Sequence, residues 1–299
     1  MIKELIVQKD PKSPISEVFR TLRTNIQFMN TNKNLKTLLI TSTVSGEGKS
    51  LVTANLAATF AQANKRVVLI DCDMRKGRQH NIFGTNSRPG LSNYLSGISS
   101  DGGDSEEDLS KYIRQTEVPN LYLFPAGNIP PNPSELIASE KMVNLLKELS
   151  ELCDLIVLDG TPSLIVTDSV ILSRFVDTTI IVTSQNETKI DELNKVKKDI
   201  DNVGGKIAGV VINKIEINNR QYQDRYYYYG HKSNLPSKKK KSENTPIRTE
   251  NLNNIPRKSE NDVSANNTKN TNTKKNDSEM KDEILTSLNN FIENNRKGE

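Results

Sequence analysis

The sequence predicts an α/β fold whose mostly parallel sheet carries helices on both faces, followed by a disordered C-terminal tail. Through residues 1–230, short apolar runs of strand length alternate with polar stretches of helical spacing, a pattern typical of parallel α/β sheets. Residues 231–299 are rich in Asn, Lys, Ser and Thr, and such a segment buries too little apolar surface to offset the entropy of ordering. We therefore expect one domain over residues 1–230 and a disordered tail after it.

A helix over residues 12–28 is the first expected element. Ser13 suits its N-cap, Pro14 its first helical position and Glu17 the positive end of its dipole. Its apolar stripe is expected at Val18, Leu22 and Ile26.

Six apolar runs are expected to be strands: Leu35–Ser42, Arg66–Asp71, Leu121–Phe124, Leu155–Leu158, Thr179–Val182 and Ala208–Ile212. A helix from Lys49 to about Asn64 should connect the first two. The carboxyl ends of parallel strands form the edge of the sheet where ligands bind, so polar residues at these ends are the candidates for function. Residues 85–118 are the least regular part and are expected to form loops and short helices on the surface.

The segment Ser45-Gly-Glu-Gly-Lys-Ser50 lies between the first strand and the following helix. In that position glycines let backbone N–H groups surround phosphate oxygens, Lys49 supplies charge to the β and γ phosphates, and the Ser50 hydroxyl reaches Mg²⁺. The motif G-x-x-x-x-G-K-[ST] is matched except that Thr43 replaces its first glycine. An ordinary glycine turn is the alternative. The residues expected to bind ATP are Ser45, Gly46, Glu47, Gly48, Lys49, Ser50 and Leu51.

Two carboxylates, Asp71 and Asp73, follow the second strand, and Arg75 comes two residues later. Both carboxylates can face the ligand edge. One can hold the metal through water while the other lies near the hydroxyl that accepts phosphate, and Arg75 can neutralise phosphate charge. Taken alone, an Asp-x-Asp sequence is also common at a solvated strand end. With Lys49, these three residues are the predicted catalytic set.

Asp159 follows the fourth apolar run and has the position of a Walker B carboxylate, held near Mg²⁺ through Ser50 and water. Ser50, Asp73 and Asp159 are therefore the predicted metal residues. The segment Gly160-Thr-Pro162 is expected to bend the chain away. Asn213 ends the last strand at the same edge and is expected to contact the base of the nucleotide.

Five of the eight tyrosines form a cluster near the end of the predicted domain: Tyr222, Tyr226, Tyr227, Tyr228 and Tyr229. The surrounding segment, residues 220–230, has no aliphatic residue and cannot alternate between buried and exposed positions as a core strand would. The five hydroxyl groups are therefore candidate acceptors of a phosphoryl group. A packed aromatic edge or a binding surface is the alternative.

Residues 12–230 resemble the bacterial tyrosine kinases (BY-kinases) of the capsular and exopolysaccharide type. The resemblance rests on motifs in order: Glu17-x-x-Arg20-x-x-Arg23, the phosphate-binding loop (P-loop) Ser45-Gly-Glu-Gly-Lys-Ser50, Asp71-x-Asp73-x-Arg75, Gly90–Gly97, Pro125–Pro133, the Walker B strand with Val166-Thr-Asp168, and the tyrosine cluster. Two departures are visible. The Walker B strand ends Asp-Gly-Thr-Pro where the family more often has Asp-Thr-Pro-Pro, and Leu51 stands where Thr is usual.

The resemblance implies an ATP-dependent kinase that phosphorylates its own tyrosine cluster in trans within a ring-shaped homo-oligomer, and that regulates capsular or exopolysaccharide polymerisation and export. It assigns oligomerisation to Glu17, Arg20 and Arg23, although a solvated helix face has the same spacing. It also implies a membrane-spanning polysaccharide chain-length regulator as activator, which recruits a cytoplasmic kinase to the inner face of the membrane, and a cognate tyrosine phosphatase.

Composition limits the other partners. No apolar stretch approaches the roughly 18 residues of a membrane-spanning helix, no signal peptide opens the chain, and the two cysteines fit a reducing cytosol. The tail holds 14 of the 41 basic and 10 of the 37 acidic residues, so the formal charge of +4 belongs to it. Its interspersed acidic residues favour a solvated linker over a nucleic-acid-binding segment. A short helix is possible near residues 279–293.

Two alternatives share this scaffold. Partitioning-type P-loop ATPases act as switches without transferring phosphate to protein; they carry a lysine where this chain has Val44, and they lack a tyrosine run. A regulatory module that binds ATP without transfer is the second. The residues Lys49, Asp71, Asp73 and Asp159 are all present, which gives no sign of an inactive site.

Overall fold

The computed structural model describes residues 4–29, 35–97 and 109–216. The tail at 231–299 and the possible helix near 279–293 lie outside the described residues. So does the predicted segment 220–230 with its five candidate acceptors, Tyr222, Tyr226, Tyr227, Tyr228 and Tyr229. Among the described residues, no helix combines the length and the apolar character that crossing a bilayer requires.

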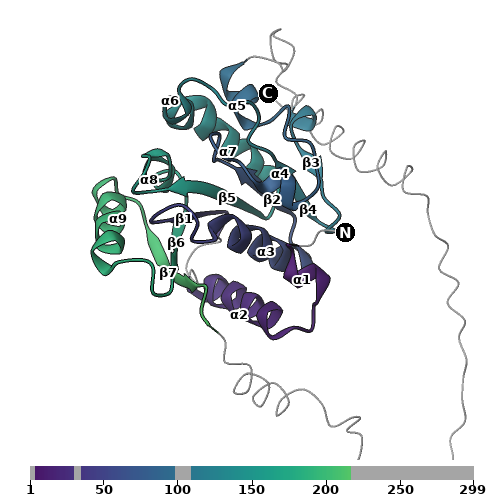
Figure 1. The fold of residues 1–299 in the computed structure, drawn as a ribbon. Helices are drawn as coiled ribbons and strands as arrows, with labels where there is room; N and C mark the ends of the chain where they lie inside the picture. The colour runs from purple at the N-terminus through teal and green to yellow at the C-terminus, as the bar shows by residue number, and fades with distance from the viewer. Residues whose placement is uncertain (1–3, 30–34, 98–108, 217–299) are drawn as a thin grey trace, which may run out of the picture. The chain divides into compact units, whose positions relative to one another are not determined.

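A seven-stranded sheet with the order β3-β4-β2-β5-β1-β6-β7 forms the centre of the described structure (Figure 1). Its strands are β1 (Thr37–Ser42), β2 (Val67–Asp71), β3 (Arg114–Gln115), β4 (Leu121–Phe124), β5 (Leu155–Pro162), β6 (Thr178–Ser184) and β7 (Ile207–Asn213). All neighbouring pairs are parallel except β3 with β4. The predicted mostly parallel sheet is therefore confirmed.

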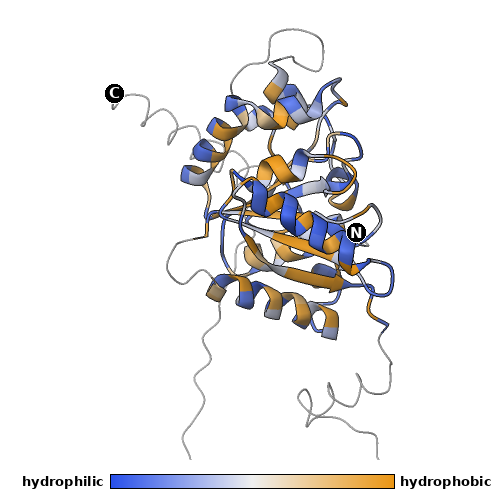
Figure 2. Cartoon of the chain, turned by 90° about the vertical axis from the view of Figure 1, so that its left-hand side faces the viewer, coloured by the Kyte–Doolittle hydropathy of each residue, from blue (hydrophilic) through white to orange (hydrophobic). Residues whose placement is uncertain are grey.

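Helices cover both faces of the sheet, as predicted. They are α1 (Ile6–Lys9), α2 (Pro14–Met29), α3 (Lys49–Gln62), α4 (Gln79–Ile82), α5 (Leu91–Ser96), α6 (Pro133–Ala138), α7 (Glu140–Leu152), α8 (Asp168–Ser173) and α9 (Ile190–Asn202). Helices α1 to α4 contribute to the apolar cluster on one face, and α5 to α9 to the clusters on the other. Figure 2 shows apolar residues concentrated along the strands and mixed with hydrophilic residues along the outer helices.

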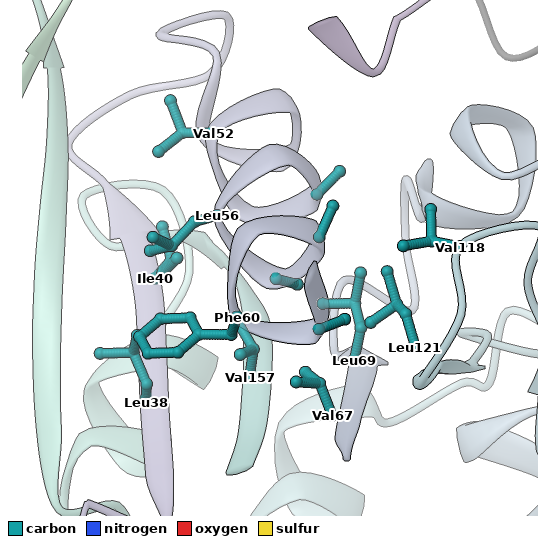
Figure 3. Close-up of a cluster of buried hydrophobic side chains, with 14 of the residues drawn as sticks. Leu38, Ile40, Val52, Leu56, Phe60, Val67, Leu69, Val118, Leu121 and Val157 are labelled. Carbon is teal, nitrogen blue, oxygen red and sulfur yellow. The ribbon is translucent and has the colours of Figure 1, made fainter. Parts of the chain in front are cut away.

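Helix α3 is buried along most of its length between the sheet and α2. In Figure 3, Leu56 lies against Ile40 of β1. Phe60 lies near Leu38 of β1 and Val157 of β5 in the same view. Strand β1 ends just before Thr43 and helix α3 begins just after Gly48. The packing of α3 on β1 therefore fixes both ends of the P-loop.

Helix α2 begins as predicted, but its buried face differs from the prediction. The Ser13 hydroxyl accepts a hydrogen bond from Ser16 N (3.1 Å), which is the expected N-cap. Val18 is 52% exposed, whereas Phe19 packs against the core and Ile26 is buried. At 3.6 residues per turn, Phe19 lies about 20° from Ile26 around the helix axis and Val18 about 80°. The predicted stripe was therefore wrong at Val18.

Strand β5 continues four residues beyond the predicted Leu155–Leu158, so the expectation that the chain leaves the sheet at Gly160 to Pro162 was wrong, although the register with β1 shifts there. Helix α8 packs directly on Gly160, where a Cβ atom would lie 2.3 Å from Ser169 Oγ. Ser169 Oγ accepts from Thr161 N (2.7 Å) and donates to Thr161 O (2.8 Å), which pairs the backbone where the register between β5 and β1 shifts. Asp159 consequently lies within the strand and not at its end.

Residues 85–97 and 109–118 contain the expected loops and short elements, including the 3₁₀ turn η1 (Leu109–Lys111). Several of their side chains are buried, however, among them two tyrosines. Tyr94 and Tyr112 have ring centroids 5.4 Å apart, and Tyr112 stacks on Phe124 of β4 at 5.9 Å. This segment therefore contributes to the core as well as to the surface.

Candidate active site

The P-loop depends on two glycines with left-handed backbone conformations. Gly46 has φ 93° and Gly48 has φ 90°, values that L side chains rarely adopt. A Cβ atom at Gly48 would also lie 2.2 Å from the Nδ2 atom of Asn213. Asn213 Nδ2 donates to Glu47 O (2.8 Å), so the end of β7 lies directly against the loop. Its predicted contact with the base stays a prediction.

Glu47 is buried and bonds to the start of its own loop. Its Oε2 atom accepts from Thr43 N (2.7 Å) and Val44 N (3.0 Å), and its Oε1 accepts from Thr43 Oγ1 (2.6 Å). The hydroxyl of Thr188, between β6 and α9, donates to the same carboxylate. The side chain of Glu47 thus holds the loop together, and what it offers to a ligand is its backbone.

Lys49 begins α3 and points into a group of oxygen atoms. Its Nζ atom lies 3.3 Å from Asp159 Oδ1, 3.7 Å from Asp73 Oδ2 and 3.2 Å from Ser50 Oγ. Burial disfavours the charged form of Lys49. The attraction of the neighbouring carboxylates, Asp159 first, outweighs that cost, so the pKa of Lys49 is raised above its usual value. Lys49 is therefore a buried cation at neutral pH.

Asp71 is fully buried and accepts from the backbone N–H groups of Gln79 (3.0 Å) and Asp73 (3.3 Å). Burial, and then repulsion from Asp159, raises the pKa of Asp71 to about 7, against the opposing effects of the Gln79 hydrogen bond and of Lys49. Such a value makes Asp71 a suitable proton acceptor near neutral pH.

Asp73 directs one oxygen towards Lys49 and binds its own loop with the other, since Oδ1 accepts from Lys76 N at 2.9 Å. The loop returns so closely over β2 that a Cβ atom at Gly77 would lie 2.9 Å from Asp71 Oδ2. This path carries the chain from the end of β2 to Gln79, at the start of α4.

Arg75 has different neighbours from those that its predicted role requires. Its guanidinium pairs with Asp168, and its Nη2 atom lies 3.3 Å from Ser134 Oγ. Ser134 in turn donates to Asp168 Oδ1 (2.5 Å). Asp168 is fully buried. Arg75 therefore links the β2 loop to α6 and α8, and its action on phosphate stays a prediction.

The candidate oligomerisation residues lie on α2. Arg20 pairs with Glu17 (2.8 Å) and donates to Pro11 O, while Arg23 Nη1 donates to Thr59 O of α3 (2.9 Å). Arg23 is therefore part of the packing between α2 and α3, and these residues do not form one solvated face. Their role between copies of the chain stays a prediction. Leu51 is 40% exposed at the start of α3.

The donor set fits a magnesium ion. Ser50, Asp73 and Asp159 present hard oxygen atoms around the one ammonium group of Lys49. In the described part of the chain no cluster of three His, Cys, Asp or Glu side chains forms a complete metal cage. Mg²⁺ commonly keeps several waters and binds through one or two carboxylates and substrate phosphates, so a cage is not required.

Comparison with known proteins agrees with this geometry. The family model of the CobQ/CobB/MinD/ParA nucleotide binding domain matches residues 38–236. The putative tyrosine-protein kinase CapB of Staphylococcus aureus is 42% identical over 230 residues, which cover 77% of this chain and 96% of that protein. The chain belongs to the bacterial tyrosine kinases.

Two solved structures of bacterial tyrosine kinases share its fold. The chimerical protein CapA2B2 has a TM-score of 0.67 and 37% identity, covering 73% of this chain and 92% of that one. The kinase domain of the Escherichia coli tyrosine kinase ETK has a TM-score of 0.64 and 30% identity, and the match covers 71% of this chain and 82% of that one. The predicted family and the P-loop fold are confirmed, and the chain is a tyrosine kinase with a nucleotide-binding domain.

The identity of the phosphate acceptors stays a prediction. Tyr222, Tyr226, Tyr227, Tyr228 and Tyr229 follow the last described residue, Glu216, by 6 to 13 positions. The described residues therefore bring together the predicted nucleotide and metal groups without the hydroxyls that would accept phosphate.

Sequence reasoning missed three contacts in this site. Gln79 and Ser134 gave no signal, because a buried Gln or Ser has no characteristic spacing, and Asp168 entered only through the resemblance. All three are distant in sequence from the groups that they contact: Gln79 contacts Asp159, and Ser134 and Asp168 contact Arg75.

Proposed function

We propose that this bacterial tyrosine kinase transfers the γ-phosphoryl group of ATP to another copy of the chain in a homo-oligomeric ring. The proposed acceptors are Tyr222, Tyr226, Tyr227, Tyr228 and Tyr229. The observation that supports the proposal most is the contact of Lys49, beside the P-loop, with Asp159 of β5 and with Asp73 in the loop after the adjacent strand β2. The end of β7 supports it further, since Asn213 lies against the P-loop only nine residues before the first tyrosine of the cluster.

Each group has a defined task in this proposal. Lys49 and the P-loop N–H groups bind phosphate oxygens, while Ser50, Asp73 and Asp159 hold Mg²⁺, which when bound neutralises phosphate charge. The tyrosyl oxygen forms a bond to the γ-phosphorus as the bond to the β-phosphate oxygen breaks, and ADP leaves. Asp71 accepts the phenolic proton.

The cellular setting is also part of the proposal. A membrane-spanning polysaccharide chain-length regulator docks on the cytoplasmic kinase, recruits it to the inner face of the membrane and activates it, and a tyrosine phosphatase resets it. Glu17, Arg20 and Arg23 mediate assembly of the ring. Similarity to the chimerical protein CapA2B2 and to kinases named for capsule or exopolysaccharide systems supports this setting.

Purified protein incubated with ATP and MgCl₂, with the cytosolic segment of the activator fused or added, tests the reaction by peptide mass mapping. Phosphate on the cluster tyrosines, absent in Lys49→Met, is expected. Hydrolysis of ATP without phosphotyrosine would instead favour a partitioning-type ATPase switch. Binding of ATP with neither activity, with the activator present, would favour a regulatory module.

A further inference from the structure

Gln79 connects the three motifs of the site. Its Nε2 atom donates to Asp159 Oδ2 (2.7 Å) of the Walker B strand and to Ser50 O (3.0 Å) of the P-loop helix. Its backbone N–H donates to Asp71 Oδ2 (3.0 Å) at the end of β2. The side chain is fully buried. A single residue that bonds to all three motifs is placed to control their geometry.

The orientation of its amide is fixed by these contacts. Asp159 Oδ2 and Ser50 O both accept hydrogen bonds, so the nitrogen of the Gln79 amide must face them. The carbonyl oxygen Oε1 therefore has one orientation, on the side of the amide that faces away from those two groups. Within the described part of the chain, this buried Oε1 atom has no hydrogen-bond partner. A buried acceptor without a partner destabilises the fold, so its retention in such a site needs a reason.

The two carboxylate oxygens of Asp159 have different hydrogen-bond partners. Its Oδ1 atom faces Lys49 Nζ (3.3 Å) and Thr53 Oγ1 (3.3 Å), and its Oδ2 atom faces Gln79. The Gln79 amide thus sets the rotation of a carboxylate that the proposed function assigns to the metal. Residues that orient metal ligands through hydrogen bonds typically change metal affinity 10- to 100-fold when replaced.

We propose that Gln79 is a positioning residue for the metal, which orients Asp159 through Nε2 and accepts a hydrogen bond from a metal-bound water through Oε1. This inference rests on the proposed function, because it needs a magnesium nucleotide in the same site. Mg²⁺ keeps several of its waters in such sites, and those waters are hydrogen-bond donors. A free acceptor on the same side chain that orients Asp159 suits one of them.

The test measures how strongly the metal and the nucleotide favour each other's binding. The affinity of a fluorescent ADP analogue is measured by anisotropy in EDTA and again in saturating MgCl₂, and the ratio of the two dissociation constants is the metal coupling. Gln79→Met keeps the length of the side chain and removes both hydrogen-bonding atoms. Gln62→Met is the matched control, because Gln62 is exposed at the end of α3 and bonds to Val7 O.

For Gln79→Met we expect affinity in EDTA within about twofold of the unmodified protein and metal coupling lowered at least about 10-fold. Unchanged coupling in a folded variant would overturn the inference while leaving the proposed function intact, and so would equal losses in EDTA and in MgCl₂, which a merely structural role produces. Absence of coupling in the unmodified protein would overturn both the inference and the magnesium part of the proposed function.

Gln79→Glu keeps the test decisive if the methionine variant does not fold. An oxygen then replaces Nε2, so the side chain no longer donates to Asp159 Oδ2 and Ser50 O. Metal coupling should therefore fall in Gln79→Glu as well. Coupling equal to that of the unmodified protein would show that residue 79 does not face the metal and would overturn the inference.

Discussion

Asp71 and Asp159 are register partners on the adjacent parallel strands β2 and β5, and both are fully buried. Their proximity follows from the strand order, because β5 lies between β1 and β2. The charge of Asp159 adds to the cost of ionising the buried Asp71, and so raises the pKa of Asp71. Lys49, which contacts Asp159 directly, supplies the opposing charge.

The first prediction concerns pH and stability without nucleotide or metal. An acid with a higher pKa in the folded protein stabilises the fold most below its unfolded pKa, and that contribution is lost as pH rises through the folded pKa. For the pKa of Asp71 the window runs from its usual value of 3.8 to about 7. Asp71→Asn should therefore gain stability relative to the unmodified protein between pH 5 and 8, by at least about 1 kcal/mol or roughly 2–4 °C in Tm.

Thermal unfolding in EDTA across this pH range measures the effect. Asp191→Asn serves as the control, because Asp191 is exposed on α9. If the Tm of Asp71→Asn and the Tm of the unmodified protein change in parallel across this pH range, the pKa of Asp71 is not raised.

The second prediction separates strain from collision in the P-loop. Gly48→Ala should destabilise the protein and abolish nucleotide binding, because it combines a φ of 90° with a 2.2 Å approach to Asn213. Gly204→Ala is the control for strain alone, since its φ is 75° with nothing within 4 Å of the added atom. We expect Gly204→Ala to lower the free energy of unfolding by roughly 1–3 kcal/mol, and Gly48→Ala to lower it by more. Denaturant unfolding measures both, and equal losses would show that the contact with Asn213 adds nothing.

The third prediction concerns the buried charge of Lys49. Lys49→Met should lower stability as well as remove phosphotransfer, because Asp159 and Asp73 lose the cation that they contact. Removing one partner from a buried ion pair typically costs about 3–5 kcal/mol, and denaturant unfolding measures the loss. Adding Asp159→Asn to this variant should restore part of the loss without restoring activity. A Lys49→Met protein as stable as the unmodified one would mean that these carboxylates are uncharged or hydrated.

The fourth prediction distinguishes two roles of Arg75. Arg75→Ala leaves Asp168 buried without its guanidinium partner, and Arg75→Ala with Asp168→Asn should recover stability through an interaction energy of about 0.5–3 kcal/mol, measured by denaturant unfolding. If Arg75 also acts on phosphate, the double variant will be stable but slow in autophosphorylation. A stable double variant with full activity would restrict Arg75 to linking the β2 loop with α6 and α8.

The parts of the molecule that depend on neighbouring residues in sequence were predictable. The strand, turn and helix around Lys49 occupy one continuous segment, and the N-cap at Ser13 depends on residues three apart. The strand ends bearing Asp71 and Asn213 were also expected. Those local rules place the phosphate site at the edge of the sheet before any tertiary contact is known.

The parts that depend on distant contacts were not predictable. Strand β5 extends past Gly160 because Ser169 of another element pairs its backbone, which no local rule contains. Val18 was predicted on the buried face of α2 because Val18, Leu22 and Ile26 follow the four-residue spacing of an apolar stripe. In the structure Phe19 packs against the core instead, and Val18 is exposed. Gln79 contacts Asp159, 80 positions away.

The contacts of Lys49 have a further consequence for how the site is loaded. Before any ligand binds, its carboxylates already hold a cation that is part of the chain. A divalent ion that entered this site would compete with the Lys49 ammonium group for the same two carboxylates. Because the chain supplies this counter-charge itself, the kinase keeps a dense set of acidic groups buried without depending on a ligand to stay folded.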